Sequence, residues 1–248
     1  MITRDITPEL RQALRHLKLS PMVATLPERL RQFRESKMDA EDLLQIVFSA
    51  EVQRRQQQST RNRANKAGLD PTMVMDAWDR AAGVTYDRAL LDRLATLQFL
   101  AAHEHVLHTG PVGVGKTFLA HALGHLACAR RLTVICDSAD KLFKRLKASR
   151  LDQTHAAELR RVCTVDLLII DDFGLRPLDG HETADFYDIV EQRHRKASMI
   201  VTSNREPKEW LPLLADPLHA QSAVDRFSNN AHDLVIEGES YRKRQKPR

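Results

Sequence analysis

The chain has 248 residues, a length that predicts one or two domains and a core large enough to fold without disulfide or metal staples. Its composition, 42% hydrophobic and 29% charged with nine Gly and ten Pro, excludes a disordered or collagen-like chain. Lys and Arg total 38 against 33 Asp and Glu, and the formal net charge of +5 permits a polyanionic partner without requiring one.

The cellular compartment is indicated by the cysteines and by the apolar runs. The three cysteines stand at positions 128, 136 and 163, outside any C-x-x-C spacing, so neither a disulfide framework nor a zinc site is expected. Charged residues interrupt the amino-terminal segment, and no window approaches the about 18 apolar residues of a membrane helix. We therefore expect a cytoplasmic protein with no signal peptide and no membrane segment.

Residues 1–75 are expected to form a helical amino-terminal domain, because apolar residues recur there at three- to four-residue spacing. The stretch 52–66 holds five basic residues and no acid, and it includes Arg54 and Arg55. These two arginines are candidates for contact with DNA or with a partner protein, and a plain solvated surface is an equal alternative. A Gly-Leu-Asp-Pro break then ends the module near residues 70 to 76.

Residues 76–240 change to apolar runs that alternate with amphipathic stretches, which predicts an α/β domain with a parallel sheet covered by helices. Strands are expected at 106–109, 132–136, 165–170, 199–202 and 234–236. Helices are expected at 116–130, 139–148, 156–162 and 181–196. The last eight residues, 241–248, contain five basic residues and no acid, and we expect them to form a basic tail.

The segment that begins at Gly110 fits the phosphate-loop pattern G-x-x-x-x-G-K-[ST], and it lies between an apolar run and an amphipathic stretch. Its glycines allow backbone N–H groups to converge on phosphate oxygens at the positive end of the following helix. Lys116 is expected to reach the β and γ phosphates, and the Thr117 hydroxyl is expected to bind Mg²⁺. The residues expected to bind the nucleotide are Gly110, Pro111, Val112, Gly113, Val114, Gly115, Lys116, Thr117 and Phe118.

Two further apolar runs end in polar residues. Residues 167–170 lead into Asp171 and Asp172, at the strand end where doubly wound sheets bind their ligands. We expect Asp171 to hold Mg²⁺ through water and Asp172 to polarise the attacking water. Residues 199–203 lead into Asn204, whose amide would orient that water if the strands are neighbours, although a turn-forming Ser-Asn pair is the alternative.

Five strings of the sequence together carry a family resemblance. They are GPVGVGKTFLAHALG (110–124), DLLIIDDFG (166–174), SMIVTSNREPKEW (198–210), AVDRFSNNAHDLVIEGESYR (223–242) and, more loosely, LRHLKLSPMVATLPERL (14–30). With them most of the chain resembles the AAA+ ATPases, and more narrowly the IstB-type helper ATPases of insertion-sequence transposition, relatives of the DnaC helicase loaders. The resemblance implies a five-stranded parallel sheet flanked by helices, no carboxy-terminal lid domain, and the use of ATP and Mg²⁺.

By this resemblance Arg226 matches the arginine that reaches into a neighbouring subunit's nucleotide and stabilises charge on the transferring phosphoryl group. The active site would then be shared between the protomers of a homo-oligomer. From the residues alone, a surface ion pair with Asp225 is the alternative. The chain departs from the family pattern at Asp172, where most AAA+ proteins carry Glu. The shorter side chain leaves a larger gap to the water, which predicts slow or partner-dependent hydrolysis.

A row of basic residues follows the second expected strand. Lys141, Lys144, Arg145 and Lys147 share part of a helix face, close to where the initiator branch of AAA+ proteins carries a helix that touches nucleic acid. Such a row would bind the phosphate backbone without reading sequence, and an ordinary solvated helix face is the alternative. Trp78 and Trp210 are isolated in the sequence and do not predict a base-stacking surface.

The resemblance implies an ATP-dependent, DNA-binding regulator of DNA transposition. Such a protein would oligomerise on duplex target DNA and would recruit and stimulate a partner transposase of the IstA type. A DnaC-like loader of the replicative helicase is the first alternative, because its AAA+ core would be the same. A small-molecule P-loop kinase is the second, and the Asn204 and Arg226 elements argue against it.

Overall fold

The structure is a computed structural model that describes residues 6–36, 38–80 and 83–240. The expected basic tail, 241–248, lies outside the described residues. The chain divides into two compact units, Met1–Ser59 and Thr60–Arg248. The sequence placed this boundary near residue 75 instead. The difference arises because one long helix belongs to both units, and its last turns pack into the core of the second unit.

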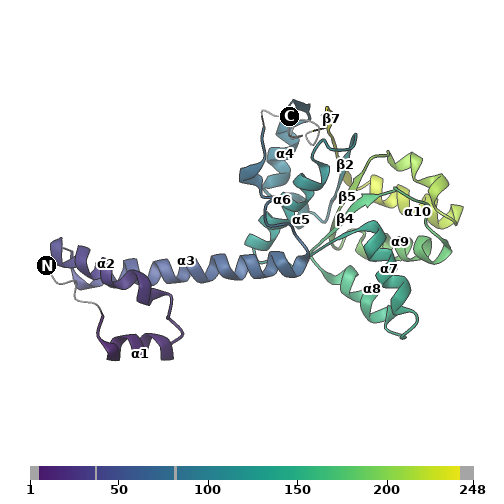
Figure 1. Cartoon of the computed structure of the whole chain (residues 1–248). Helices are drawn as coiled ribbons and strands as arrows, with labels where there is room; N and C mark the ends of the chain where they lie inside the picture. The colour runs from purple at the N-terminus through teal and green to yellow at the C-terminus, as the bar shows by residue number, and fades with distance from the viewer. Residues whose placement is uncertain (1–5, 37, 81–82, 241–248) are drawn as a thin grey trace, which may run out of the picture. The chain divides into compact units, whose positions relative to one another are not determined.

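The first unit is helical, as the apolar spacing predicts. It contains α1 (Pro8–His16), α2 (Met22–Glu35) and most of α3 (Ala40–Ala67), which Figure 1 draws as the longest helix of the chain. Thr7 begins α1 as an N-cap, since its hydroxyl accepts a hydrogen bond from the Leu10 N–H at 3.3 Å. The small core of the unit consists of Ile6, Leu14, Met22, Leu26 and Val47.

Arg54 and Arg55 serve this unit by neutralising a buried carboxylate. The Glu51 side chain is 4% exposed and accepts hydrogen bonds from Arg54 Nε at 2.8 Å and from Arg55 Nε at 2.7 Å. Arg55 also donates to the Lys18 carbonyl at 2.9 Å, which ties α3 to the end of α1. The hydrogen bond from Arg54 is the main reason why the pKa of Glu51 falls to about 2.

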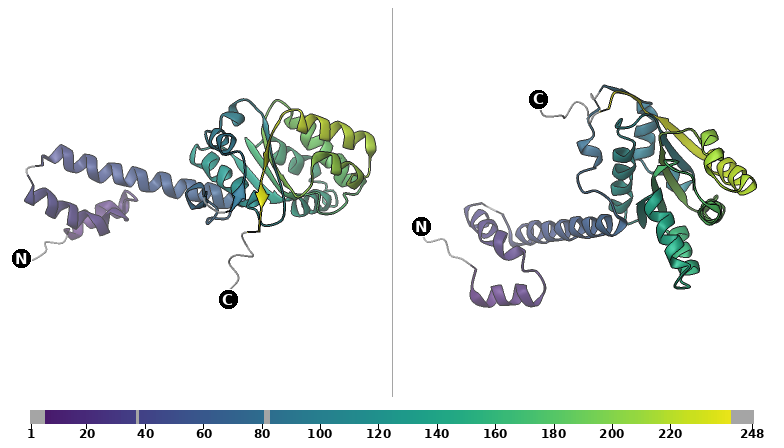
Figure 2. Two further views of the ribbon diagram at one scale, coloured as in Figure 1. Left: turned by 90° about the horizontal axis from the view of Figure 1, so that it is seen from above. Right: turned by 45° about the vertical axis from the view of Figure 1, so that its right-hand side comes forward.

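The second unit is built on a five-stranded parallel sheet with the strand order β3-β4-β5-β2-β6 (Figure 2). The predicted fold class is therefore confirmed, and each expected strand is present with its ends shifted by a few residues. The strands are β2 (His105–Thr109), β3 (Val134–Ser138), β4 (Leu167–Phe173), β5 (Ser198–Ser203) and β6 (Ala231–Val235).

Helices cover both faces of the sheet, because alternate residues of the central strands face opposite cores. Leu168 and Ile170 pack in one core, and Leu167 and Ile169 pack in the other. One core is covered by α7 (Ala139–Ser149), α8 (His155–Thr164), α9 (Gly180–Arg193) and α10 (Pro217–Ser228). The other is covered by α4 (Arg88–Ala95), α5 (Gln98–Ala101), α6 (Lys116–Ala129) and the last turns of α3.

Several elements were not expected from the sequence. They include α4, α5 and α10, the short 3₁₀ helices η1 (Met75–Ala77), η2 (Pro207–Glu209) and η3 (Leu211–Leu213), and the pair β1 (Val84–Thr85) and β7 (Glu237–Gly238). Capping residues mark two of these helices: Asp87 accepts from the Leu90 N–H, and Asp216 precedes the proline at the first position of α10. Within the described residues, which end at Ser240, no lid domain follows β6. None of the described helices combines the length and the apolar character needed to cross a bilayer.

The end of α3 is fastened to α6, the helix that follows the phosphate loop. Arg63 Nε donates to the Cys128 carbonyl in the last turn of α6 at 2.9 Å. The Asp70 N–H donates to His121 Nδ1 at 2.9 Å, and His125 Nε2 donates to the Asp70 carbonyl at 2.8 Å. The position of the phosphate-loop helix is therefore tied to the chain segment that ends α3.

We expect Glu51→Gln to weaken the first unit, because the arginines then lose their buried anion. The free energy of local opening should fall by about 2 kcal/mol at neutral pH, the order of a hydrogen bond to a charged group. Amide hydrogen exchange over residues 6–36 measures it. Because the pKa of Glu51 is depressed from 4.5 to about 2, the difference from the unchanged protein should be complete above pH 4.5 and should vanish as the pH falls toward 2.

Glu28→Gln is the matched control, since Glu28 pairs with Arg31 on the same unit but both side chains are more than half exposed. Its substitution should change the opening free energy by less than about 0.5 kcal/mol. Equal protection in the Glu51 and Glu28 variants would contradict the assignment of Arg54 and Arg55 to a structural role.

Candidate functional site

The phosphate loop connects β2 to α6, and its glycines are required by its shape. Gly110, Gly113 and Gly115 have φ values of 138°, 86° and 103°, which side chains rarely allow. A Cβ atom on Gly115 would lie 2.6 Å from the Trp78 ring, and one on Gly110 would collide with the Ile236 carbonyl. The loop is therefore enclosed by η1 on one side and by the chain that follows β6 on the other.

Lys116 occupies the hollow of this loop. Its Nζ donates hydrogen bonds to the Gly110 and Pro111 carbonyls, each at 2.7 Å. The residue is buried, and burial lowers the pKa of the ammonium group. A desolvated cation that is hydrogen-bonded to two neutral carbonyls is favourably placed to exchange them for phosphate oxygens, which carry full negative charge.

His108 lies beneath the loop and was not singled out by its sequence. Its Nδ1 lies 3.2 Å from the Lys116 carbonyl oxygen, so the neutral ring donates a hydrogen bond to the first residue of α6. Burial lowers the pKa of His108 to about 4, and the imidazole is neutral near pH 7. The signal in the sequence is a histidine directly after the two apolar residues Val106 and Leu107 of the strand.

Asp171 gathers two hydroxyl groups at the carboxyl edge of the sheet. The Thr117 hydroxyl donates to Asp171 Oδ1 at 2.9 Å, and the Thr202 hydroxyl donates to the same oxygen at 2.5 Å. Thr202 also accepts the Asp172 N–H at 2.9 Å. Thr202 thus fixes both carboxylate residues. The sequence did not indicate this role, because the partners of Thr202 belong to another strand, β4.

The structure places Asp172 and Asn204 at the same edge of the sheet. Asp172 is exposed and has a φ of 55°, at the point where the register between β4 and β5 shifts. Ser203 of β5 pairs with Thr109 of β2. Asn204, the residue after Ser203, therefore lies level with Gly110, the first residue of the phosphate loop. Both polar side chains therefore leave the sheet beside the loop.

The residues beside the loop fit a Mg²⁺ ion. The Thr117 hydroxyl and the Asp171 carboxylate supply oxygen donors within hydrogen-bond distance of one another. Mg²⁺ characteristically takes one or two protein oxygens, substrate phosphates and water rather than a full protein cage. Thr117 and Asp171 are thus the residues that would hold the ion.

Aromatic side chains stand where the loop enters α6. Trp78 Nε1 donates to the Tyr86 hydroxyl at 2.9 Å, and the Trp78 and Phe118 ring centroids are 5.4 Å apart. Trp78, although isolated in the sequence, therefore has two aromatic neighbours in the fold, and one of them, Phe118, is remote in sequence. Trp210 is fully buried between Phe173 and Phe227 and serves the core, so it has no exposed face for a base.

Most of the basic candidates for DNA contact have carboxylate partners. Lys144 pairs with Asp140 and Lys147 pairs with Asp179, each at 2.8 Å and largely exposed. Arg145 is two-thirds buried and bonds both Asp137 and Glu158. Lys141 is exposed on α7 with no carboxylate partner among the described residues. Arg145 therefore has a structural role, as Arg54 and Arg55 have, because each of the three pairs with a carboxylate of its own chain.

Arg226 lies far from the phosphate loop of its own chain. It is in the last turn of α10, two residues before that helix ends at Ser228. The first residue of the next strand, β6, pairs with the first residue of β2. The loop begins at the opposite end of β2, after about 15 Å of strand at 3.3 Å per residue. Arg226 therefore does not complete the site of its own protomer.

The comparisons with known proteins agree with this geometry. A model of the IstB-like ATP binding protein family matches residues 12–248. A putative ATP-binding protein in an insertion sequence of Mycobacterium tuberculosis is 34% identical over 241 residues, covering 97% of this chain and 96% of that protein. The putative ATP-binding protein of insertion sequence IS21 from Pseudomonas aeruginosa is 29% identical over 238 residues, covering 96% and 90%.

Among solved structures, the replication initiator DnaA bound to AMPPCP and single-stranded DNA has the same fold, with a TM-score of 0.58 and 24% identity. The match covers 69% of this chain and 51% of that chain. At this identity the likeness concerns the fold, the AAA+ sheet flanked by helices.

Thr202→Val should slow nucleotide hydrolysis, because Asp171 and Asp172 both lose their hydrogen bond to the hydroxyl. We expect a loss of about 10- to 100-fold, typical of residues that orient a metal ligand, with nucleotide affinity less affected. Thr202→Ser keeps the hydroxyl and should retain most of the rate. Steady-state hydrolysis and equilibrium nucleotide binding measure the two quantities, and equal rates in the valine and serine variants would refute the role of Thr202.

Proposed function

Because this chain belongs to the IstB-like ATP-binding protein family, we propose that it is an ATP-hydrolysing regulator of DNA transposition that assembles on duplex DNA and recruits and stimulates a partner transposase of the IstA type. The proposal depends on one observation above all. Thr117 and Asp171 are hydrogen-bonded to one another beside the phosphate loop, and Arg226 lies at the opposite end of the sheet.

In the proposed reaction the chain's own residues bind and orient the triphosphate. Lys116 exchanges the two loop carbonyls for the β and γ phosphates, and loop N–H groups hold the remaining oxygens. Mg²⁺, held by Thr117 and Asp171, supplies charge neutralisation at the phosphates. Asp172 accepts a proton from the attacking water, and Asn204 orients that water. Because Asp is shorter than Glu, we propose that hydrolysis is slow until DNA or a partner protein tightens the site.

The aromatic residues beside the loop suit the base of the nucleotide. Trp78 and Phe118 are partly exposed and stand beside the amino end of α6, where the phosphates would be held. An aromatic ring offers a stacking face to any base, so this pair supports a nucleoside triphosphate rather than a simple phosphate ester as the ligand.

Arg226 would complete the site of a neighbouring protomer. Its distance from its own loop supports a shared site, because a guanidinium gains the most by meeting the charge that develops on the transferring phosphoryl group. Nucleotide then acts as a contact between protomers, and hydrolysis loosens that contact by removing the γ phosphate. Oligomerisation driven by ATP follows from this arrangement.

Duplex DNA binding is proposed on the charge of the chain and on the exposed lysines of α7. Lys141 has no carboxylate partner in the described residues, and Lys144 and Lys147 make exposed ion pairs that exchange readily for phosphates. Such contacts bind any sequence and weaken steeply with salt. Arg54, Arg55 and Arg145 contribute less, since each already neutralises a buried or half-buried carboxylate.

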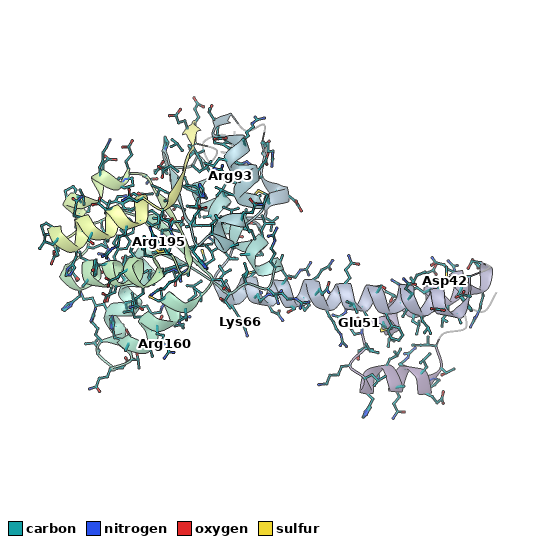
Figure 3. All side chains as sticks on the ribbon, turned by 180° about the vertical axis from the view of Figure 1, so that it is seen from behind. Asp42, Glu51, Lys66, Arg93, Arg160 and Arg195 are labelled. Atoms are coloured by element: carbon teal, nitrogen blue, oxygen red, sulfur yellow. The ribbon has the colours of Figure 1, made fainter. Side chains whose placement is uncertain are left out.

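Arg226→Ala should abolish ATP-dependent assembly on duplex DNA and lower hydrolysis by about 10³-fold, the lower range for arginine fingers. Nucleotide affinity of the isolated protomer should not change, because Arg226 lies outside its own site. Light scattering with ATP, Mg²⁺ and duplex DNA measures assembly. Arg160→Ala is the matched control, since Arg160 is an exposed arginine on α8 (Figure 3). Assembly and hydrolysis that persist unchanged in the Arg226 variant would remove the shared site.

The partner separates the proposed function from that of a helicase loader, because the AAA+ core serves both. With ATP and duplex DNA present, the full chain should retain an IstA-type transposase on an affinity resin and should raise its strand-transfer rate. A replicative helicase of the same cell should not be retained. Retention of the helicase alone would favour the loader.

A further inference from the structure

Arg226 is held by two residues of the neighbouring helix α9. Its Cζ lies 5.4 Å from the centroid of the Tyr187 ring, and its Nη1 lies 3.6 Å from Glu191 Oε1. The Tyr187 hydroxyl donates to the same Glu191 oxygen at 3.1 Å. Figure 1 shows α9 and α10 as neighbouring helices, and the two are in contact. The guanidinium is therefore in contact with an aromatic face and a carboxylate before any neighbour is present.

The Tyr187 ring is itself fixed from α10. The His219 ring lies 4.7 Å from it, and His219 Nδ1 is bonded to Asp216 at 3.0 Å. The ring thus lies close to both His219 and Arg226, one near the beginning and one near the end of the same helix. A support that is fixed by a second contact limits the directions in which the arginine can extend.

The contacts leave the guanidinium able to bind an anion. Arg226 Nη1 is itself buried and makes no hydrogen bond to any described residue, and its distance from Glu191 is too long for one. The side chain is 37% exposed. An aromatic face attracts a cation without using its N–H groups, so Arg226 can remain on Tyr187 while the donors in the exposed part of its guanidinium point to a phosphate.

We propose that Tyr187 and Glu191 are positioning residues that hold Arg226 ready for the triphosphate of a neighbouring protomer. The inference rests on the proposed shared site. A free arginine loses much side-chain freedom when it binds, and an arginine that is already held loses less. The pair acts only through Arg226, so its effect belongs to the neighbour's site and not to the site of its own chain.

Tyr187→Leu removes the aromatic face and should lower hydrolysis in the assembled protein by about 10- to 100-fold, the order expected for a misplaced group at a reacting centre. The loss should be in kcat, while nucleotide binding by the isolated protomer stays unchanged. Tyr187→Phe keeps the face and should retain most of the rate. Glu191→Lys places a like charge beside Arg226 and should lower kcat as well, and its half-exposed position allows it to fold. Gln192→Lys adds a lysine at the next, exposed residue and is the control for a new positive charge on this part of α9.

Mixed assemblies decide in which site the residues act. Asp172→Asn protomers cannot polarise the water but carry an intact Arg226, so they can supply it to others. Added to Tyr187→Leu or Glu191→Lys protomers, they should restore hydrolysis, because the variant's own site then receives a properly held arginine. Loss without restoration would overturn the inference, and so would unchanged rates in both variants.

A reference mixture of Arg226→Ala with Asp172→Asn protomers keeps the two claims apart. If this mixture regains hydrolysis while the Tyr187 and Glu191 variants behave like the unchanged protein, the shared site stands and the positioning role is lost. If the reference mixture gains nothing and Arg226→Ala hydrolyses normally, the proposed function itself fails.

Discussion

The candidate site depends on the pairing of three parallel strands, β4, β5 and β2, in that order. This order brings the carboxyl ends of the three strands to one edge, so that Asp171, Thr202 and the phosphate loop meet although they are far apart in the chain. Asp171 then accepts hydroxyls from both neighbours, Thr117 of the loop helix and Thr202 of β5. A carboxylate shared in this way fixes the loop helix and two strands to one another.

The same parallel arrangement separates the two halves of the proposed reaction site. All five strands of the sheet run in the same direction. A residue at the end of a helix that leads into a strand therefore lies at the amino ends of the strands, far from the loops that follow their carboxyl ends. Arg226 ends α10 and the phosphate loop leaves β2, on opposite sides of the sheet. In the proposed site, Arg226 and the phosphate loop therefore do not meet within one chain.

The sequence predicted the parts of the fold that depend on local pattern. The buried residues 167–170 of β4 and 199–201 of β5 form continuous apolar runs, and the glycines of the loop mark positions with positive φ. The sequence also brought Lys116, Thr117 and Asp171 under one hypothesis, and the structure places Thr117 and Asp171 in direct contact. Short helices such as α5, and α10 with its small buried residues Ala220 and Ala223, lacked a period strong enough to detect.

What the sequence could not give depends on contacts between distant residues. Trp78 looks isolated until folding brings Phe118 beside it, and Arg54 looks free until Glu51 is found to be buried. A run of basic residues shows their charge but not whether each charge already has a partner. Arg145 has two carboxylate partners, Asp137 and Glu158, and Glu158 follows it by 13 residues in the chain. A binding role for a charged residue is therefore harder to predict from sequence than a phosphate loop. The glycines of a phosphate loop indicate its backbone conformation directly, whereas the partners of a charged residue are known only in the folded chain.

A site divided between protomers has a thermodynamic consequence for this family of proteins. If nucleotide favours assembly because Arg226 meets the phosphates, then assembly must raise nucleotide affinity by the same factor, since coupling between two binding equilibria is reciprocal. DNA that gathers protomers would therefore tighten ATP binding without touching the phosphate loop. The shorter Asp172 adds a kinetic element, because a slow chemical step leaves time for the assembly to form before the γ phosphate is lost. Binding, assembly and hydrolysis would then follow one another in a fixed order that the geometry of a single sheet imposes.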